Sequence, residues 1–207
     1  CKIEREDVIM KKLNKNGFTL IELLAVIVIM GILMMVAIPA MTRYIENSRK
    51  DTFLTTAKEY VNATRNMWAS DSLICNTGDS ASPRIVSSGV DAGDWYVVIN
   101  TKDEDAVNLL DQGGKSSWGN RDVQGYVRVH ITEDTTGSTE RKTQYYVALS
   151  DGTHGIKDTV SAGTESDELI RSDVKSTNVK YSDVKPGLSG FDFGADSSTM
   201  AHVCIEN

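Results

Sequence analysis

The sequence is poor in cysteine, proline and histidine, with three of each among its 207 residues. The three histidines stand far apart, without the short spacing of a zinc site: His130, His154 and His202. Three later aspartates could share a calcium ion, although solvated loop acids are the commoner reading of such a set: Asp183, Asp192 and Asp196. The sequence reveals no convincing pair of a nucleophile and its base. We therefore expect no metal, no cofactor and no catalytic site.

An excess of basic residues is also missing. The formal net charge is −7, and the segment 1–17 carries a net charge of +2, so the rest of the chain carries −9. Binding nucleic acid without regard to sequence requires a basic footprint. We therefore expect no nucleic-acid partner, and the acidic balance suits an exported surface that must stay soluble.

Charge is almost absent from the range between Phe18 and Met41, where Glu22 is the one charged residue. The run is long enough to span the hydrocarbon of a bilayer, which takes about 20 residues. It exceeds the core of an ordinary secretory signal, and no small-x-small cleavage pattern closes it. Lys11, Lys12 and Lys15 lie on its N-terminal side, so we expect a single-pass protein with a cytoplasmic N-terminus.

The junction of the basic and apolar segments reads Lys15-Asn16-Gly17-Phe18-Thr19-Leu20-Ile21-Glu22-Leu23. It resembles the class III signal of type IV pilins and of type II secretion pseudopilins. In that family a membrane aspartyl protease cuts after the glycine, and the new N-terminal phenylalanine is N-methylated. The resemblance implies that Gly17 ends the leader, that Phe18 is the methylated mature N-terminus, and that Glu22 acts in assembly.

The same resemblance implies the partners. They are a prepilin peptidase and methylase, an inner-membrane platform, assembly ATPases, and further copies of the chain in a homo-oligomeric helical filament. The leader would be the segment 1–17, which we leave out of the fold prediction. Its first methionine is Met10, and Arg5-Glu6-Asp7 can be read back into a purine-rich run like a ribosome-binding site. We therefore interpret residues 1–9 as untranslated and Met10 as the start.

Two explanations of Glu22 stand side by side. A lone carboxylate among apolar residues is costly in lipid and marks a functional site. Pairing it with the α-amino group at Phe18 of a neighbouring subunit would fix the register of one helix against the next. Thr19-x-x-Glu22 also has the spacing of a capping box, in which the glutamate accepts a hydrogen bond from the backbone N–H of Thr19. Both can hold at different stages.

The helical pattern continues beyond the apolar run. Gly31 and Pro39 lie within it and predict a bend, as the kinking proline of type IV pilins also implies. Apolar residues then recur at steps of three and four: Met41, Ile45, Phe53, Ala57, Tyr60, Val61, Thr64, Met67 and Trp68. The prediction is one helix of about 80 Å at 1.5 Å per residue. Residues 18–44 form its membrane and filament-core half, and residues 45–70 form its amphipathic half.

Residues 71–207 are predicted to form a globular antiparallel-sheet domain packed on the helix, which gives an α+β fold of the pilin type. Strand patterns cover Trp95 to Asn100, Gly125 to Thr132 and Thr143 to Leu149, the last two joined by a polar hairpin loop. A short helix is predicted from Thr101 to Leu110. The chain from Ser150 on looks acidic and irregular, with a second short helix from Glu165 to Arg171.

Cysteine reappears at the two ends of this domain. Loss of the leader removes Cys1 and leaves Cys75 and Cys204. An even pair in an exported domain is typical of a disulfide. Two buried free thiols are the alternative, because the sequence does not say whether the Cβ atoms approach each other. The pairing would differ from that of many pilins, which close a C-terminal loop with two nearby cysteines.

We therefore expect a structural subunit and not an enzyme: the major pilin of a type IV pilus that serves adhesion, surface motility or biofilm formation. It would be a membrane protein first and part of an extracellular filament later. The alternative is a pseudopilin of a type II secretion or DNA-uptake machine. A third hypothesis, a single-pass membrane enzyme or receptor, requires an uncut N-terminus and a catalytic or ligand cluster, and the sequence reveals no such cluster.

Overall fold

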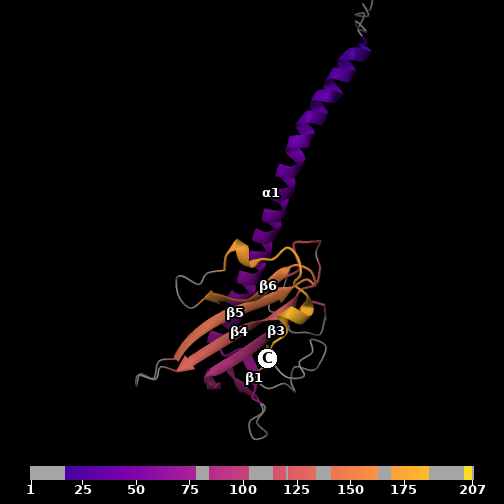
Figure 1. Ribbon diagram of the computed structural model, residues 1–207. Helices are drawn as coiled ribbons and strands as arrows, with labels where there is room; N and C mark the ends of the chain where they lie inside the picture. The colour runs from indigo at the N-terminus through magenta and orange to yellow at the C-terminus, as the bar shows by residue number, and fades with distance from the viewer. Residues whose placement is uncertain are drawn as a thin grey trace, which may run out of the picture. The chain divides into compact units, whose positions relative to one another are not determined.

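The computed structural model describes residues 17–77, 84–102, 114–119, 121–133, 141–162, 169–186 and 203–206. Internal contacts divide the chain into two units, Cys1–Tyr44 and Ile45–Asn207. One long helix, α1, begins in the first unit and ends in the second, which also contains a seven-stranded sheet (Figure 1). The fold is α+β, as the sequence predicts.

Helix α1 spans Leu20–Ala69 and stays helical through Gly31 and Pro39. Its end is built by two backbone hydrogen bonds, from Asp71 N–H to the Trp68 carbonyl and from Ser72 N–H to the Met67 carbonyl. This is the Schellman pattern, which needs a residue in the left-handed region. Asp71 fills that position with a φ of 53°. The helix therefore stops where the sequence predicts.

The part of α1 in the first unit is apolar and exposed. An 18-residue window reaches a mean hydropathy of 2.9, so α1 is long and apolar enough to cross a membrane. None of the described side chains from Phe18 to Tyr44 is buried. The bend at Gly31 and Pro39 stays a prediction, and residues 1–16 lie outside the part of the chain that the structure describes.

The part of α1 in the second unit buries one face: Phe53, Ala57, Tyr60, Val61 and Thr64. Met67 and Trp68 pack beside them and are partly buried. The predicted stripe is wrong at its first two residues, since Met41 is 61% exposed and Ile45 is 45% exposed. The loops that contact this end of the helix present polar side chains, so the apolar face begins only at Phe53.

The sheet has the strand order β2-β1-β7-β3-β4-β5-β6, with every neighbouring pair antiparallel except β3 and β7. The strands are β1 Leu73–Asn76, β2 Arg84–Val86, β3 Gly93–Asn100, β4 Gln124–Glu133, β5 Arg141–Ser150, β6 Gly155–Ala162 and β7 Val203–Glu206. The three predicted strands are confirmed as β3, β4 and β5, and the predicted hairpin pairs β4 with β5.

The chain after Ser150 is not irregular as predicted, because Gly155–Ala162 forms β6 along the edge of β5. The pairing of β6 with β5 contains register shifts, and apolar and polar residues alternate too little in β6 to predict a strand. The predicted helix ending at Arg171 is wrong at Ile170, which is extended with φ −121° and ψ 163°. Residues 165–168, and residues 103–110 of the other predicted short helix, lie outside the described residues.

The two faces of the sheet are both partly covered. Val127, Val129 and Ile131 lie on the inner face, in the core with α1, as the alternation predicts. Tyr126 points to the other face and is nevertheless buried. A short helical turn, η3 (Tyr181–Val184), packs on this face. Its Val184 forms a second apolar cluster with Tyr126, Ala148 and Val179.

The C-terminal strand β7 lies between β1 and β3, antiparallel to the first and parallel to the second. Cys75 and Cys204 are directly opposite each other in the β1–β7 pair and form a disulfide. Both residues belong to the core. The bond therefore joins the segment that follows α1 to the end of the chain, through the middle of the sheet.

Replacing both cysteines with serine should lower the free energy of unfolding by roughly 4–5 kcal/mol on the chain-entropy account. The reason is the large loop, since the two cysteines are 129 residues apart. Chemical denaturation of the full chain in detergent, followed by tryptophan fluorescence, measures the change. A reductant should destabilise the wild type to the same degree and leave the double variant unchanged. Equal stability of variant and wild type would contradict the prediction.

Candidate functional site

The start of α1 is a complete capping box. Residues 17–19 are not helical, and the Phe18 side chain is 92% exposed. The backbone N–H and the hydroxyl of Thr19 donate to Glu22 Oε2 at 2.8 and 2.7 Å, and the Glu22 N–H donates to Thr19 Oγ1 at 3.3 Å. Such reciprocal bonds satisfy N–H groups that the first turn of a helix leaves without partners. The capping reading of Glu22 is therefore realised in the folded chain.

The glycine before Phe18 is not required by the fold. Gly17 lacks a positive φ, and a Cβ built on it meets no heavy atom of the described residues within 4 Å. Gly31 is equally open. A glycine inside a helix costs about 1 kcal/mol relative to alanine. Any need for glycine at either position must therefore arise outside the described intrachain contacts.

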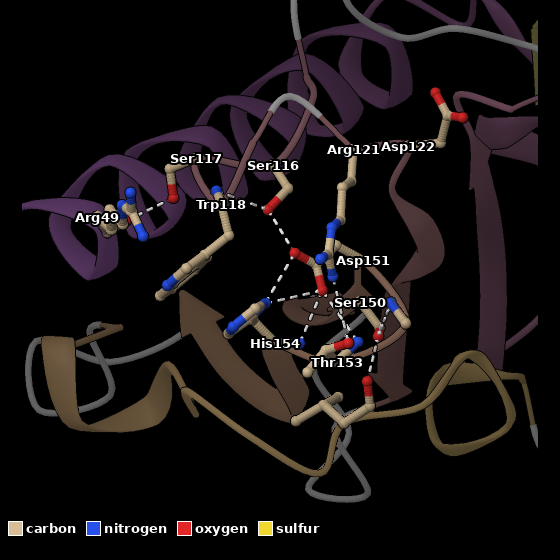
Figure 2. Close-up of polar contacts among 12 residues, drawn as sticks. Arg49, Ser116, Ser117, Trp118, Arg121, Asp122, Ser150, Asp151, Thr153 and His154 are labelled. Atoms are coloured by element: carbon tan, nitrogen blue, oxygen red, sulfur yellow. Dashed lines mark hydrogen bonds and ion pairs between the residues drawn. The ribbon is translucent and has the colours of Figure 1, made fainter. Parts of the chain in front are cut away.

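A second concentration of polar contacts surrounds Asp151, whose side chain is fully buried (Figure 2). Its carboxylate accepts hydrogen bonds from the Ser116 hydroxyl at 2.6 Å and from the backbone N–H groups of Thr153 and His154 at 2.9 and 2.7 Å. His154 Nδ1 lies 3.0 Å from Oδ2. Since a carboxylate only accepts, this nitrogen carries its hydrogen.

These donors control the ionisation of Asp151. Burial alone raises the pKa of its carboxyl, but the hydrogen bonds from Ser116, His154 and Thr153 outweigh burial and hold the pKa below its ordinary value. The charged form is thus the one that the folded chain stabilises. Stabilisation from Asp151 is fully present above the unfolded pKa of about 3.9 and is lost as the pH falls through the folded pKa.

The Asp151 cluster positions the loop 114–119 on α1. The His154 ring stacks on Trp118 with centroids 4.3 Å apart, and the backbone N–H of Trp118 donates to Ser116 Oγ at 3.1 Å. Trp118 also meets the ring of Phe53 on α1, at 5.7 Å between centroids. Figure 2 shows Asp151 and His154 in the turn after β5 beside Ser116 and Trp118 of the loop. It also shows the hydrogen bond from Ser117 of the same loop to Arg49 of α1.

The cluster contains a serine, a histidine and an aspartate, but it is not arranged for nucleophilic catalysis. In a catalytic triad the serine bonds to the histidine and the histidine to the acid. Here Ser116 and His154 both bond to Asp151, and the serine is only 3% exposed. Because the cluster lies between two packed elements, we interpret it as a structural network.

The described residues among the candidate metal ligands are not brought together. His130 pairs with Asp94 and His154 with Asp151, while Asp183 pairs with Lys157. Among the residues that the structure describes, no group of three or more histidines, cysteines or acids could hold a metal ion. His202, Asp192 and Asp196 fall outside those residues.

No pattern in the sequence predicted the Asp151 cluster. Its one local signal is the dipeptide Asp151-Gly152, a turn pair in which Gly152 takes the positive φ of 89°. The partner Ser116 is 35 residues away along the chain, in a short loop without a motif. Only the tertiary fold unites them.

Asp151→Asn should lower the free energy of unfolding at pH 7 by about 2–3 kcal/mol, because an amide replaces an acceptor of charged hydrogen bonds. Acidification below about pH 4 should destabilise the wild type more steeply than the variant. Denaturation of the full chain in detergent across pH 3–7 measures both.

Asp122→Asn is the matched control. This variant breaks only an exposed pair, with Lys115 3.2 Å away, and such pairs contribute about 0–1 kcal/mol. If the two variants lost equal stability, the Asp151 cluster would have no special structural weight.

One family model matches a segment of the chain. The model described as the prokaryotic N-terminal methylation motif matches residues 12–38. No curated protein and no solved structure matches the chain. The match supports processing by a prepilin peptidase and, with the long apolar helix, a membrane-anchored protein that is later exported. The chain thus carries the N-terminal signal of pilin-like and pseudopilin-like proteins.

Proposed function

We propose that the chain is the structural subunit, and the major pilin, of a type IV pilus. Helix α1 would hold it in the membrane, where a peptidase would cut after Gly17 and the new N-terminal Phe18 would be methylated. An inner-membrane platform with assembly ATPases would then insert it into a surface filament for adhesion, motility or biofilm formation. The observation that carries the proposal is Glu22, the one charged residue of the exposed apolar run from Phe18 to Met41, which lies within the matched methylation motif.

The proposed partner of Glu22 is the amino group at Phe18 of a neighbouring copy. Among apolar helices an unpaired carboxylate costs several kcal/mol, and an amine at the right height removes that cost. A subunit out of register would leave both charges unpaired. The pair would therefore select the correct axial register as each subunit enters.

The capping box and the ion pair are compatible. Both hydrogen bonds from Thr19 end on Oε2 of Glu22. A carboxylate offers lone pairs on two oxygens, so Oε1 can accept from a neighbouring amine while Oε2 retains the cap. Glu22 thus need not abandon the helix start when it takes part in assembly.

Glu22→Gln separates the two roles of this side chain. Glutamine can complete a capping box but cannot form an ion pair, so the variant should be cleaved normally and should form no filaments. Negative-stain microscopy of cells, with the mature protein followed by immunoblotting, measures both. Normal filaments on Glu22→Gln cells would reduce Glu22 to a helix cap.

The mature protein should begin at N-methylated Phe18, which mass spectrometry of the N-terminal peptide detects. Gly17→Ala should be cut more readily than Gly17→Leu. Since a Cβ built at this position meets no described neighbour within 4 Å, a block would come from the peptidase and not from misfolding. An uncut, unmethylated wild-type protein in cells that assemble pili would contradict the proposal.

A pseudopilin of a secretion or DNA-uptake machine is the second candidate, because the same N-terminal signal occurs there. Antibody to the globular unit distinguishes the two functions. A pilin should label long filaments on the cell surface, and a pseudopilin should label none.

A further inference from the structure

The turn of α1 from Glu46 to Asp51 is contacted by two loops of the second unit. The stretch from Glu46 to Asp51 has no apolar face, and polar groups of the two loops contact it. The guanidinium of Arg171 bonds to both carboxylate oxygens of Asp51, with 2.6 Å between Nη2 and Oδ2. Such a two-bond arrangement fixes orientation as well as distance.

Two serines add bonds to the same turn. The Ser176 hydroxyl donates to Glu46 Oε1 at 2.6 Å, and the Ser117 hydroxyl donates to the backbone carbonyl of Arg49 at 2.7 Å. The Ser176 bond also holds the pKa of Glu46 below its ordinary value. Three residues of this turn are therefore bonded to residues that lie 68 to 130 positions away.

Both loops are anchored independently of the helix. The loop 114–119 is held by the Asp151 cluster through Ser116 and by the stacking of Trp118 on His154. The segment 169–177 is attached to the start of β6 by two backbone hydrogen bonds between Gly155 and Lys175, at 2.8 and 3.1 Å. Buried Leu169 and Val174 fix it in the core. The contacts thus connect α1 to loops that are also held by other parts of the domain.

We propose that Ser117, Arg171 and Ser176 form a collar that fixes the turn Glu46–Asp51 and marks the point beyond which α1 cannot unwind or shift. Gly31 and Pro39, the weak points of the helix, both precede the collar. Conformational change in the apolar half would then stop at Glu46 and leave the packed half in place. This last consequence rests on the proposed function, whereas the collar itself does not.

An exposed ion pair alone contributes little, and the side chains of Arg171 and Asp51 are about half exposed. The collar stabilises the turn through the sum of several bonds, because opening this one turn breaks all of them together. Local opening of this kind is what amide hydrogen exchange reports. The amides from Glu46 to Phe53 are therefore the probe.

The experiment is hydrogen–deuterium exchange of the full chain in detergent micelles, analysed by mass spectrometry. In the triple variant Ser117→Ala, Arg171→Ala and Ser176→Ala, exchange of the 46–53 segment should accelerate about 5- to 30-fold, the factor for the loss of one or two kcal/mol. Exchange of residues 57–64, whose buried face packs in the core, should stay as in the wild type. Arg171→Ala alone should give a smaller acceleration.

Lys157→Ala is the matched control, because it removes a comparable exposed pair, with Asp183, between β6 and η3. It should leave the 46–53 segment unchanged. Unaltered exchange in the triple variant would overturn the collar, since packing of Phe53 on Trp118 would then suffice. Equal acceleration at 57–64 would also overturn it, by indicating global destabilisation. Neither result depends on filaments, so the collar and the pilus function fail separately.

Discussion

A carboxylate on an apolar helix must have partners, and Glu22 meets this constraint inside its own chain first. Thr19 supplies two donors to one oxygen, which gives α1 a defined start at Leu20. The cap leaves the negative charge in place and the second oxygen available for another donor. In lipid, and still more between packed helices, that charge favours an amine nearby. The proposed filament follows from this demand, since a neighbouring N-terminus would supply the amine.

The second unit serves the helix by fixing where it is held. Apolar packing begins only at Phe53, and the preceding turn is bonded through polar side chains of the two loops. Those loops depend in turn on Asp151, whose buried charge is stabilised by four donors, and on the edge of β6. The disulfide joins the last strand, β7, which lies between β1 and β3, to β1. Each feature ties α1 to distant parts of the chain.

The sequence predicted those elements whose formation depends on residues that are close together along the chain. The continuous apolar run and the following stripe predicted α1 to within a few residues, and the alternation around Val127 and Val147 predicted the β4–β5 hairpin. The capping spacing of Thr19 and Glu22 also appears in the structure as an actual capping box.

Non-local features escaped prediction. Strands β1, β2 and β7 have only three or four residues each, too few for a periodic signal, and β7 pairs with β1 from the far end of the chain. Tyr126 is buried on the expected solvent face because η3 folds back over it, which no alternation in β4 could reveal. The Asp151 cluster and the collar likewise join residues tens of positions apart. The cleavage, methylation and assembly roles of Gly17, Phe18 and Glu22 stay predictions that rest on the motif.

The most direct test of the central claim is a helical reconstruction of filaments purified from cells that express this chain. The account predicts density for α1 in the filament core, with the Glu22 carboxylate within hydrogen-bond distance of the Phe18 nitrogen of a neighbouring subunit. A filament in which Glu22 bonds only to its own Thr19, while the Phe18 nitrogen of each neighbour lies elsewhere, would contradict it.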